Sequence, residues 1–192
     1  MERTVNTSSP VERSGRILIA GIGNIFLGDD GFGVAVAQRL LQRKEKQYPP
    51  GVEVVDFGIR GLDLAYTLLA DYAALLLVDA IPRGGSPGTL YVIEPDLAGV
   101  DAEQGAQAGQ AGLAAHSMDP VKVLAFARTL GARPIRTLLV GCEPAPLGAG
   151  DAMEMQMELS APVAAAVDEA VRIIDTLVDK LLHEKGILLC SD

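Results

Sequence analysis

The sequence predicts an α/β domain built on a mainly parallel β-sheet with helices on both faces. Short apolar runs that end near glycine alternate with amphipathic segments along most of the chain, an order typical of βαβ units. One run, "AALLLVDAI", is interrupted only by Asp79, as is typical of a central strand covered on both faces. Apolar residues make up 49% of the chain and aromatic residues only 4%, so we expect an aliphatic core.

The expected strands are short apolar runs bounded by turn residues. They are Ile17–Ile22, Val52–Phe57, the run "AALLLVDAI", Thr89–Glu94 and Ile135–Val140. The third and fourth runs are joined by the glycine-rich loop "PRGGSPG". Because this connection is too short to hold a crossover helix, we expect the fourth strand to be an antiparallel exception.

Helices are predicted between the strands and at the end of the chain. Their expected ranges are Gly31–Lys44, Gly61–Ala70, Pro120–Leu130 and about Ala161–His183. Asp119 and Pro120 suit the cap and the first position of the third helix, and Ser160 suits the cap of the last. The Gly/Ala/Gln-rich stretch 97–115 has no clean period and is predicted to be a loop.

Length and charge limit the function classes. The 192 residues suit a single domain over 16–185, with a loose N-terminal tail at 1–15 and a C-terminal tail at 186–192. A net charge of −9 opposes binding to nucleic acid or to an anionic membrane. Two cysteines are too few for a disulfide framework, and no apolar run is long enough to span a membrane. We therefore expect a cytoplasmic, monomeric protein.

The stretch "GIGNIFLGDDGFG" resembles the start of a dinucleotide-binding fold, and a nucleotide-binding module is one hypothesis. Gly21 and Gly23 match its first two glycines, and Asp56 suits its acidic residue at the end of the second strand. However, Phe26 occupies the third glycine position, and Asp29 and Asp30 would repel a pyrophosphate at the helix start. The pattern favours a ligand that binds carboxylates.

Polar groups gather where the expected strands end, the edge at which parallel sheets bind ligands. They are Asn24, Asp29, Asp30, Asp56, Asp79, Cys142 and Glu143, with His116 in the loop before a helix. Each alone has a structural explanation, such as a helix cap, acceptance of loop amides or a solvated loop residue. Asp79 nevertheless ends a hydrocarbon strand, where a lone carboxylate is costly unless it is paired or bound to a cation. Carboxylates with one imidazole suit Zn²⁺, Ni²⁺ or Fe²⁺.

Cys142 and three other polar side chains need interpretations of their own. Cys142 is a nucleophile with His116 as base or, more commonly for a lone cysteine at a strand end, a small buried residue. Arg60 and Arg83 either orient a partner's carboxylate or pair with the aspartates. His183 suits the dipole at a helix C-terminus and is assigned no function.

Five motifs together resemble the hydrogenase maturation endopeptidases: "GIGNIFLGDDGFGV", "DFGIRGLDL", "LLLVDAI", "AHSMDPVKVL" and "VGCEP". They occur in the order of that family and cover the chain from Ile17 to about Arg172. The resemblance implies a three-layer α/β/α sandwich around a twisted five-stranded sheet. It implies removal of the C-terminal extension of the [NiFe]-hydrogenase large-subunit precursor after nickel insertion, which activates that enzyme. The tail before Gly15 and the long loop before His116 depart from the family pattern.

The resemblance also implies roles for individual residues. The family's metal-binding positions fall on Asp30, Asp79 and His116, and a further acidic position, catalytic or nickel-recognising, falls on Asp56. Asp30, Asp56 and Asp79 are thus the expected catalytic residues of an aspartic-type or metal-dependent peptidase. Nickel is expected to arrive with the precursor, and a surrogate divalent metal is an alternative. A non-catalytic nickel-sensing chaperone of the large subunit is the second hypothesis.

Overall fold

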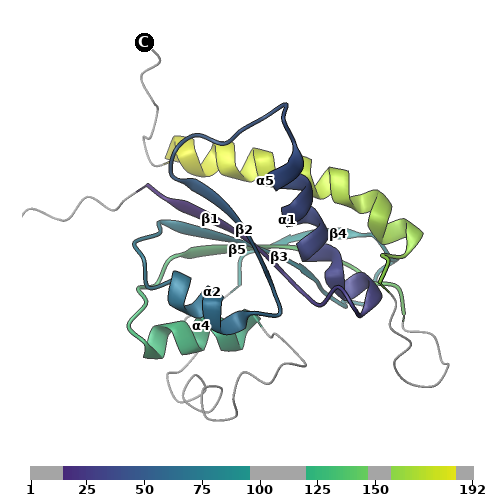
Figure 1. Ribbon diagram of the computed structural model, residues 1–192, viewed down its shortest axis with the longest axis horizontal. Coiled ribbons are helices and arrows are strands. Elements are labelled where there is room, and N and C mark those ends of the chain that lie inside the picture. Colours follow the sequence, from purple (N-terminus) through teal and green to yellow (C-terminus); the bar gives the residue numbers. More distant parts are fainter. Residues whose placement is uncertain (1–14, 96–119, 147–156, 185–192) are drawn as a thin grey trace, which may run out of the picture.

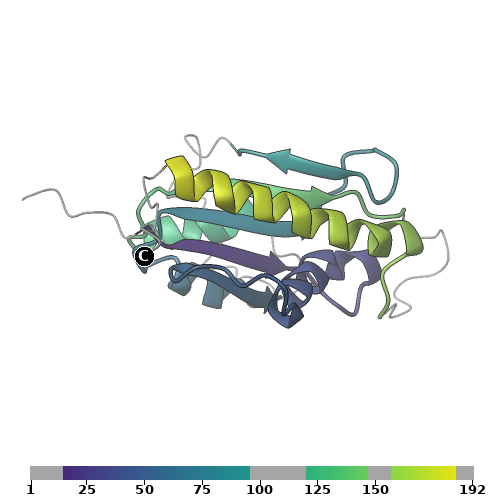
Figure 2. The same cartoon turned by 90° about the horizontal axis from the view of Figure 1, so that it is seen from above.

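The computed structural model describes residues 15–95, 120–146 and 157–184 (Figure 1). Five strands form one sheet in the order β2-β1-β3-β5-β4. The strands are β1 (Ile17–Ile22), β2 (Val52–Gly58), β3 (Ala74–Ala80), β4 (Leu90–Ile93) and β5 (Arg136–Cys142). All pairs are parallel except β4 with β5, which Figure 2 shows as arrows in opposite directions. The predicted antiparallel exception is confirmed.

Helices cover both faces of the sheet, so the predicted sandwich is confirmed (Figure 1). They are the 3₁₀ turn η1 (Gly28–Gly31), α1 (Phe32–Gln42), α2 (Gly61–Thr67), α4 (Pro120–Thr129) and α5 (Ala161–Glu184). Apart from Gly15, the two predicted tails lie outside the described residues. Among those that are described, no helix is long and apolar enough to cross a bilayer.

The core consists of two layers separated by the sheet. One layer joins alternate residues of β1 and β3, such as Ile19 and Leu76, to α1 and α5. The other joins the intervening residues, such as Ala20 and Leu77, to the face of α2 and α4. Side chains alternate across a strand, so this division fixes the face on which every strand residue lies.

The first helix starts and ends inside its predicted range. Residues 28–31 form the 3₁₀ turn, and Gly31 is the N-cap of α1 without a side-chain hydrogen bond. Asp29 and Asp30 therefore do not cap α1, one of the structural explanations left open by the sequence. The helix ends at Gln42 because Arg43 is extended, with φ −69° and ψ 139°.

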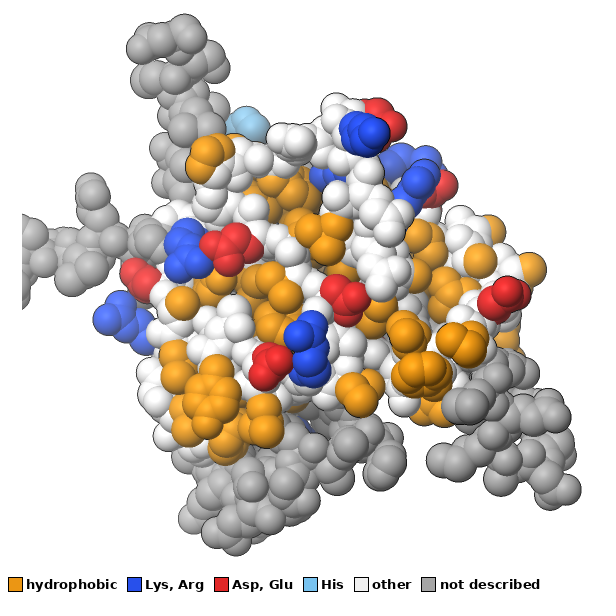
Figure 3. Space-filling view, in the orientation of Figure 1, with side chains coloured by type: hydrophobic (Ala, Val, Ile, Leu, Met, Phe, Trp, Pro, Cys, Tyr) orange, Lys and Arg blue, Asp and Glu red, His pale blue; other side chains and the backbone are white. Residues whose placement is uncertain are grey.

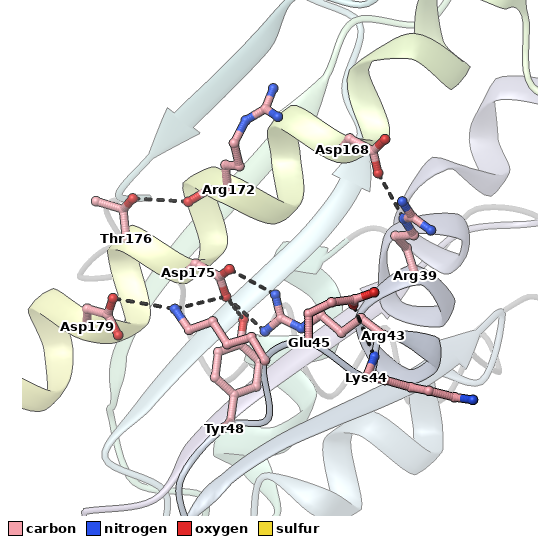
Figure 4. Close-up of polar contacts among 11 residues, drawn as sticks. Arg39, Arg43, Lys44, Glu45, Tyr48, Asp168, Arg172, Asp175, Thr176 and Asp179 are labelled. Atoms are coloured by element: carbon pink, nitrogen blue, oxygen red, sulfur yellow. Dashed lines mark hydrogen bonds and ion pairs between the residues drawn. The ribbon is translucent and has the colours of Figure 1, made fainter.

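Beyond Arg43, a polar cluster joins the α1–β2 connection to α5 (Figure 4). Asp175 accepts hydrogen bonds from both terminal nitrogens of Arg43, at 2.8 and 2.9 Å, and from the Tyr48 hydroxyl at 2.8 Å. Burial raises the pKa of the Asp175 carboxyl, but Arg43 and Tyr48 outweigh burial and hold the pKa below its usual value. This cluster lies at the amino ends of the parallel strands, so it stabilises the end of the sheet opposite the candidate site.

Candidate functional site

The strand order places a topological switch point between β1 and β3. From β1 the chain crosses to β2 on one side, and later enters β3 on the other side of β1. Connections leave in opposite directions there, and open α/β sheets bind ligands in the resulting crevice at the carboxyl ends of the strands. The turn η1 follows β1 and contacts β3. Asp30 in η1 and Asp79 near the end of β3 therefore lie at the same switch point.

Asp30 is held by the loop that follows β1. Its Oδ2 accepts a hydrogen bond of 2.7 Å from the backbone N–H of Asn24, and its own N–H donates to the Leu27 carbonyl at 3.3 Å. Gly23, with φ 128°, lies against the Asp30 carbonyl, where a Cβ would clash. This glycine thus permits the turn that sets the half-buried Asp30 carboxylate at the end of β1.

Asp79 is 9% exposed at the end of the central strand. Its Oδ1 accepts a hydrogen bond of 2.8 Å from the N–H of Ala80, the next residue. Alternation with Leu75 and Leu77 places Asp79 on the α2/α4 face. Helix α4 begins at Pro120, shortly after His116 in the sequence. His116 itself lies outside the described residues.

Asp56 lies on the other face of the sheet. It pairs in register with Gly21, follows the α1/α5-face residues Val52 and Val54 in alternation, and accepts a hydrogen bond of 3.2 Å from Gln38 of α1. Since β1 separates β2 from β3, the backbones of Asp56 and Asp79 are about 10 Å apart at ordinary strand spacing. The structure therefore does not bring these two carboxylates together as a pair sharing one proton, whose groups would lie about 3 Å apart.

Asp29, next to Asp30, makes hydrogen bonds to a different part of the chain. Its Oδ2 accepts hydrogen bonds of 2.8 Å from the N–H of Ala145 and from the Ser160 hydroxyl, and its Oδ1 accepts one of 2.6 Å from the Ser160 N–H. One carboxylate thus fastens η1 to the segment after β5 and to the residue before α5. The sequence places Asp29 at the strand edge but contains no local signal for partners more than a hundred positions away.

Glu143 organises the loop between β3 and β4. Its carboxylate accepts hydrogen bonds from the backbone N–H groups of Arg83 and Gly84 and from the Tyr91 hydroxyl, at 2.8–2.9 Å. Burial raises the pKa of this carboxyl, but these donors outweigh burial, so the net pKa is lowered. The Arg83 guanidinium lies 5.5 Å from the Tyr91 ring centroid. These contacts give Glu143 a structural role in shaping the loop that leaves the end of β3.

The other candidate side chains are explained by local contacts. Cys142 is fully buried, and burial is the main cause that raises the pKa of its thiol to about 11, so the buried interpretation is supported over a nucleophile. Arg60 donates to the carbonyl oxygens of Asp56 and Phe57 and lies 3.6 Å from the Asp63 carboxylate. The ring Nδ1 of His183 lies 2.6 Å from the Asp179 carbonyl, a contact within one turn of α5.

One large hollow in the described part of the chain lies far from Asp30 and Asp79. It has a volume of 640 Å³ and includes Arg128, Ile135 and Arg136, where β5 begins. The Glu94 carboxylate accepts a hydrogen bond of 3.0 Å from Arg136 beside it. Parallel strands separate this amino end of β5 from the switch point, so the hollow is not part of the candidate site.

The donor set at the switch point suits a cation better than an anion. The ligand groups from Asp30 and Asp79 are oxygens, and no group of three His, Cys, Asp or Glu side chains in the three described segments is arranged to hold a metal. Two carboxylates alone would hold a divalent ion weakly, so a lasting site needs His116 or ligands from a partner.

Comparison with known proteins agrees with this architecture. The family model of hydrogenase maturation protease (HycI) matches residues 34–176. The chain is 35% identical to hydrogenase expression/formation protein HupM of Azotobacter chroococcum, over 91% of this chain and 75% of that protein.

Two solved structures share the fold. The hydrogenase 2 maturation peptidase of a Thaumarchaeota archaeon is 30% identical, covers 85% of this chain and 98% of its own, and superposes with a TM-score of 0.59. The hydrogenase maturating endopeptidase HybD of E. coli is 28% identical and superposes with a TM-score of 0.62, over 89% of this chain and 94% of HybD. The chain belongs to the hydrogenase maturation protease family and is a peptidase that processes a hydrogenase precursor.

Proposed function

We propose that the protein removes the C-terminal extension of a [NiFe]-hydrogenase large-subunit precursor after nickel has been inserted, and that it recognises the nickel through Asp30, Asp79 and His116. The observation that carries this proposal is the position of Asp30 and Asp79 at the switch point between β1 and β3. Family membership supplies the reaction class, and the oxygen-rich donor set supports a transient contact with a metal that belongs to the substrate.

Asp79 and Asp30 share one role in this proposal, as oxygen ligands of the nickel. Asp79, nearly buried at the end of β3, gives a fixed oxygen ligand, and Asp30 gives a second one from a turn held by Asn24. Substrate nickel can polarise the scissile carbonyl and lower the pKa of a bound water. A carboxylate at the switch point accepts a proton from the water as its oxygen bonds to the scissile carbonyl carbon. The same carboxyl returns that proton to the leaving amine as the C–N bond breaks.

Asp56 is assigned to recognition rather than to proton transfer at the scissile bond. Its carboxylate lies on the α1 face and accepts a hydrogen bond from Gln38, and β1 separates it from Asp79. A recognition role predicts that Asp56→Asn raises KM more than it lowers kcat. A proton-transfer role would lower kcat and change the pH profile of kcat.

The direct test is to incubate the protein with nickel-loaded and nickel-free precursor and to measure the precursor mass by mass spectrometry. We expect the wild-type protein to shorten only the nickel-loaded form. Asp79→Asn and His116→Ala should abolish this shortening, whereas Asp168→Asn, at an exposed ion pair on α5, should not change it. Equal cleavage of both forms would contradict nickel recognition.

Two further outcomes separate the proposal from its alternatives. Undiminished cleavage by Asp79→Asn or His116→Ala would contradict the assigned site while leaving the reaction intact. Binding of the nickel-loaded precursor without loss of its C-terminal peptide would indicate a nickel-sensing chaperone.

The nucleotide hypothesis predicts that NAD raises the melting temperature by mass action. A Cβ on Gly33 would overlap the carbonyl oxygens of Ile22 and Val78, so close packing of α1 on the sheet accounts for this glycine without a phosphate.

A further inference from the structure

Large apolar side chains are exposed in the loop that carries Asp30 and in the segment that leads from β2 into α2. They are Ile25, Phe26, Leu27, Ile59 and Leu62, called here the apolar rim. Their exposed fractions range from 38% for Leu27 to 49% for Ile59. Figure 3 shows hydrophobic side chains gathered over the loop between β1 and α1 and over the region of α2.

The backbone holds the first half of the rim in place. The Asn24 side chain accepts a hydrogen bond of 3.0 Å from the N–H of Phe26, and its backbone carbonyl accepts one of 3.0 Å from Leu27. The Asn24 N–H donates to the Asp30 carboxylate at 2.7 Å. The loop is therefore closed on the candidate metal ligand itself, and its apolar side chains point outward from a fixed turn.

The second half of the rim is joined to the first through the main chain. The N–H of Gly23 donates to the carbonyl of Gly58 at 3.0 Å, which links the ends of β1 and β2. Ile59 follows Gly58 directly, and Leu62 lies in the first turn of α2. Both halves thus adjoin the switch point, with Asp30 in the loop of one half and Asp56 just before the other.

Single exposed apolar residues are normal, but several large ones beside a functional group indicate a protein-binding surface. Because Ile25–Leu27 and Asp30 belong to one loop, a substrate whose peptide bond reaches Asp30 lies next to the rim, so we take that substrate as the occupant. A second copy of the chain is a poorer occupant, because two chains with a charge of −9 each repel one another.

Because the apolar rim adjoins Asp30, we infer that it docks the large-subunit precursor. The rim would contact an apolar surface of the precursor next to the C-terminal extension of that precursor. The inference rests on the proposed function for the identity of the occupant. Docking through Ile25–Leu27 and Ile59–Leu62 would align the extension across the end of β1, towards Asp30 and Asp79. The rim would contribute to affinity for the whole precursor and would not take part in bond cleavage.

Steady-state kinetics with the nickel-loaded precursor test this role. Phe26→Ser and Leu62→Ser should each raise KM about tenfold, as expected for a large interface residue, with kcat within about twofold of wild type. Leu41→Ser and Val92→Ser are matched controls, because these residues are 56% and 49% exposed on α1 and β4. Unchanged KM in both rim variants, or an equal rise in the controls, would overturn the inference.

A binding measurement separates this inference from the proposed function. Labelled precursor is titrated with Asp79→Asn protein, with and without Phe26→Ser, and fluorescence anisotropy is recorded. An affinity about tenfold weaker with Phe26→Ser supports the rim even if wild-type protein cleaves nothing, an outcome in which the proposed function fails alone. Equal affinity in a system that cleaves normally overturns the rim alone. A wild-type dimer in light scattering that Phe26→Ser dissociates would assign the rim to self-association instead.

Discussion

Replacing Asp29 by alanine is expected to destabilise the protein by about 2–4 kcal/mol. Its carboxylate accepts three hydrogen bonds, from the Ala145 N–H at 2.8 Å and from the Ser160 N–H and hydroxyl at 2.6 and 2.8 Å. Hydrogen bonds to charged groups contribute about 1.5–3 kcal/mol each. The full sum is not expected, because Asp29 is only half-buried and water can reach the donors left behind.

Urea denaturation followed by circular dichroism measures this loss, and the melting temperature should fall by about 4–16 °C. Asp168→Ala is the matched control: it removes an ion pair with Arg39 whose side chains are 63% and 58% exposed, and should cost at most about 1 kcal/mol. If Asp29→Ala unfolded at the same urea concentration as Asp168→Ala with an unchanged slope, the Asp29 hydrogen bonds would contribute no more stability than the exposed ion pair.

Three other changes test separate parts of the structure. Gly33→Ala gains up to about 1 kcal/mol of helix propensity, but the added Cβ would overlap main-chain oxygens of β1 and β3. We therefore expect the free energy of unfolding, measured in urea, to fall by about 1–3 kcal/mol. In a Cys190→Ser background, Cys142 should react with iodoacetamide at pH 8 only when urea unfolds the chain; free-thiol rates without urea would contradict its burial. Folding lowers the pKa of Asp175, so the stability that Asp175 contributes is present above about pH 4 and is lost as pH falls through the lower pKa of the folded state. Asp175→Asn should therefore flatten the fall in unfolding free energy at acid pH. An unchanged fall would show that Asp175 does not cause it.

The sequence predicts the architecture well because its strongest signals are local. The run at 73–81 contains β3 (Ala74–Ala80), and the short loop before Thr89 correctly predicts the antiparallel β4. Helix ends are less accurate: the second helix ends at Thr67 instead of Ala70, since residues after Thr67 form turns. Such ends depend on backbone hydrogen bonds and tertiary contacts that propensity alone does not contain.

The candidate site is predictable only in part. Strand ends place Asp30 and Asp79 at one edge of the sheet, because parallel strands share their direction, and the roles of both residues stay predictions. The same rule includes Asp56 but does not reveal on which face of the sheet Asp56 lies. That face follows from the strand register, in which Gly21 pairs with Asp56 and with Val78. The structure adds that distinction, and the expected third ligand, His116, lies outside the described residues.

The paired acids Asp29 and Asp30 show why sequence reasoning alone could not separate structure from function here. Both lie in the 3₁₀ turn η1, in which successive side chains point about 120° apart. Asp29 reaches Ser160 before α5, whereas Asp30 turns back to the N–H of Asn24 at the end of β1. Asp29 thereby fixes the turn from outside, and the turn fixes Asp30 at the switch point. Loss of Asp29 should therefore reduce both stability and cleavage, whereas Asp30→Asn should reduce cleavage with a smaller effect on stability.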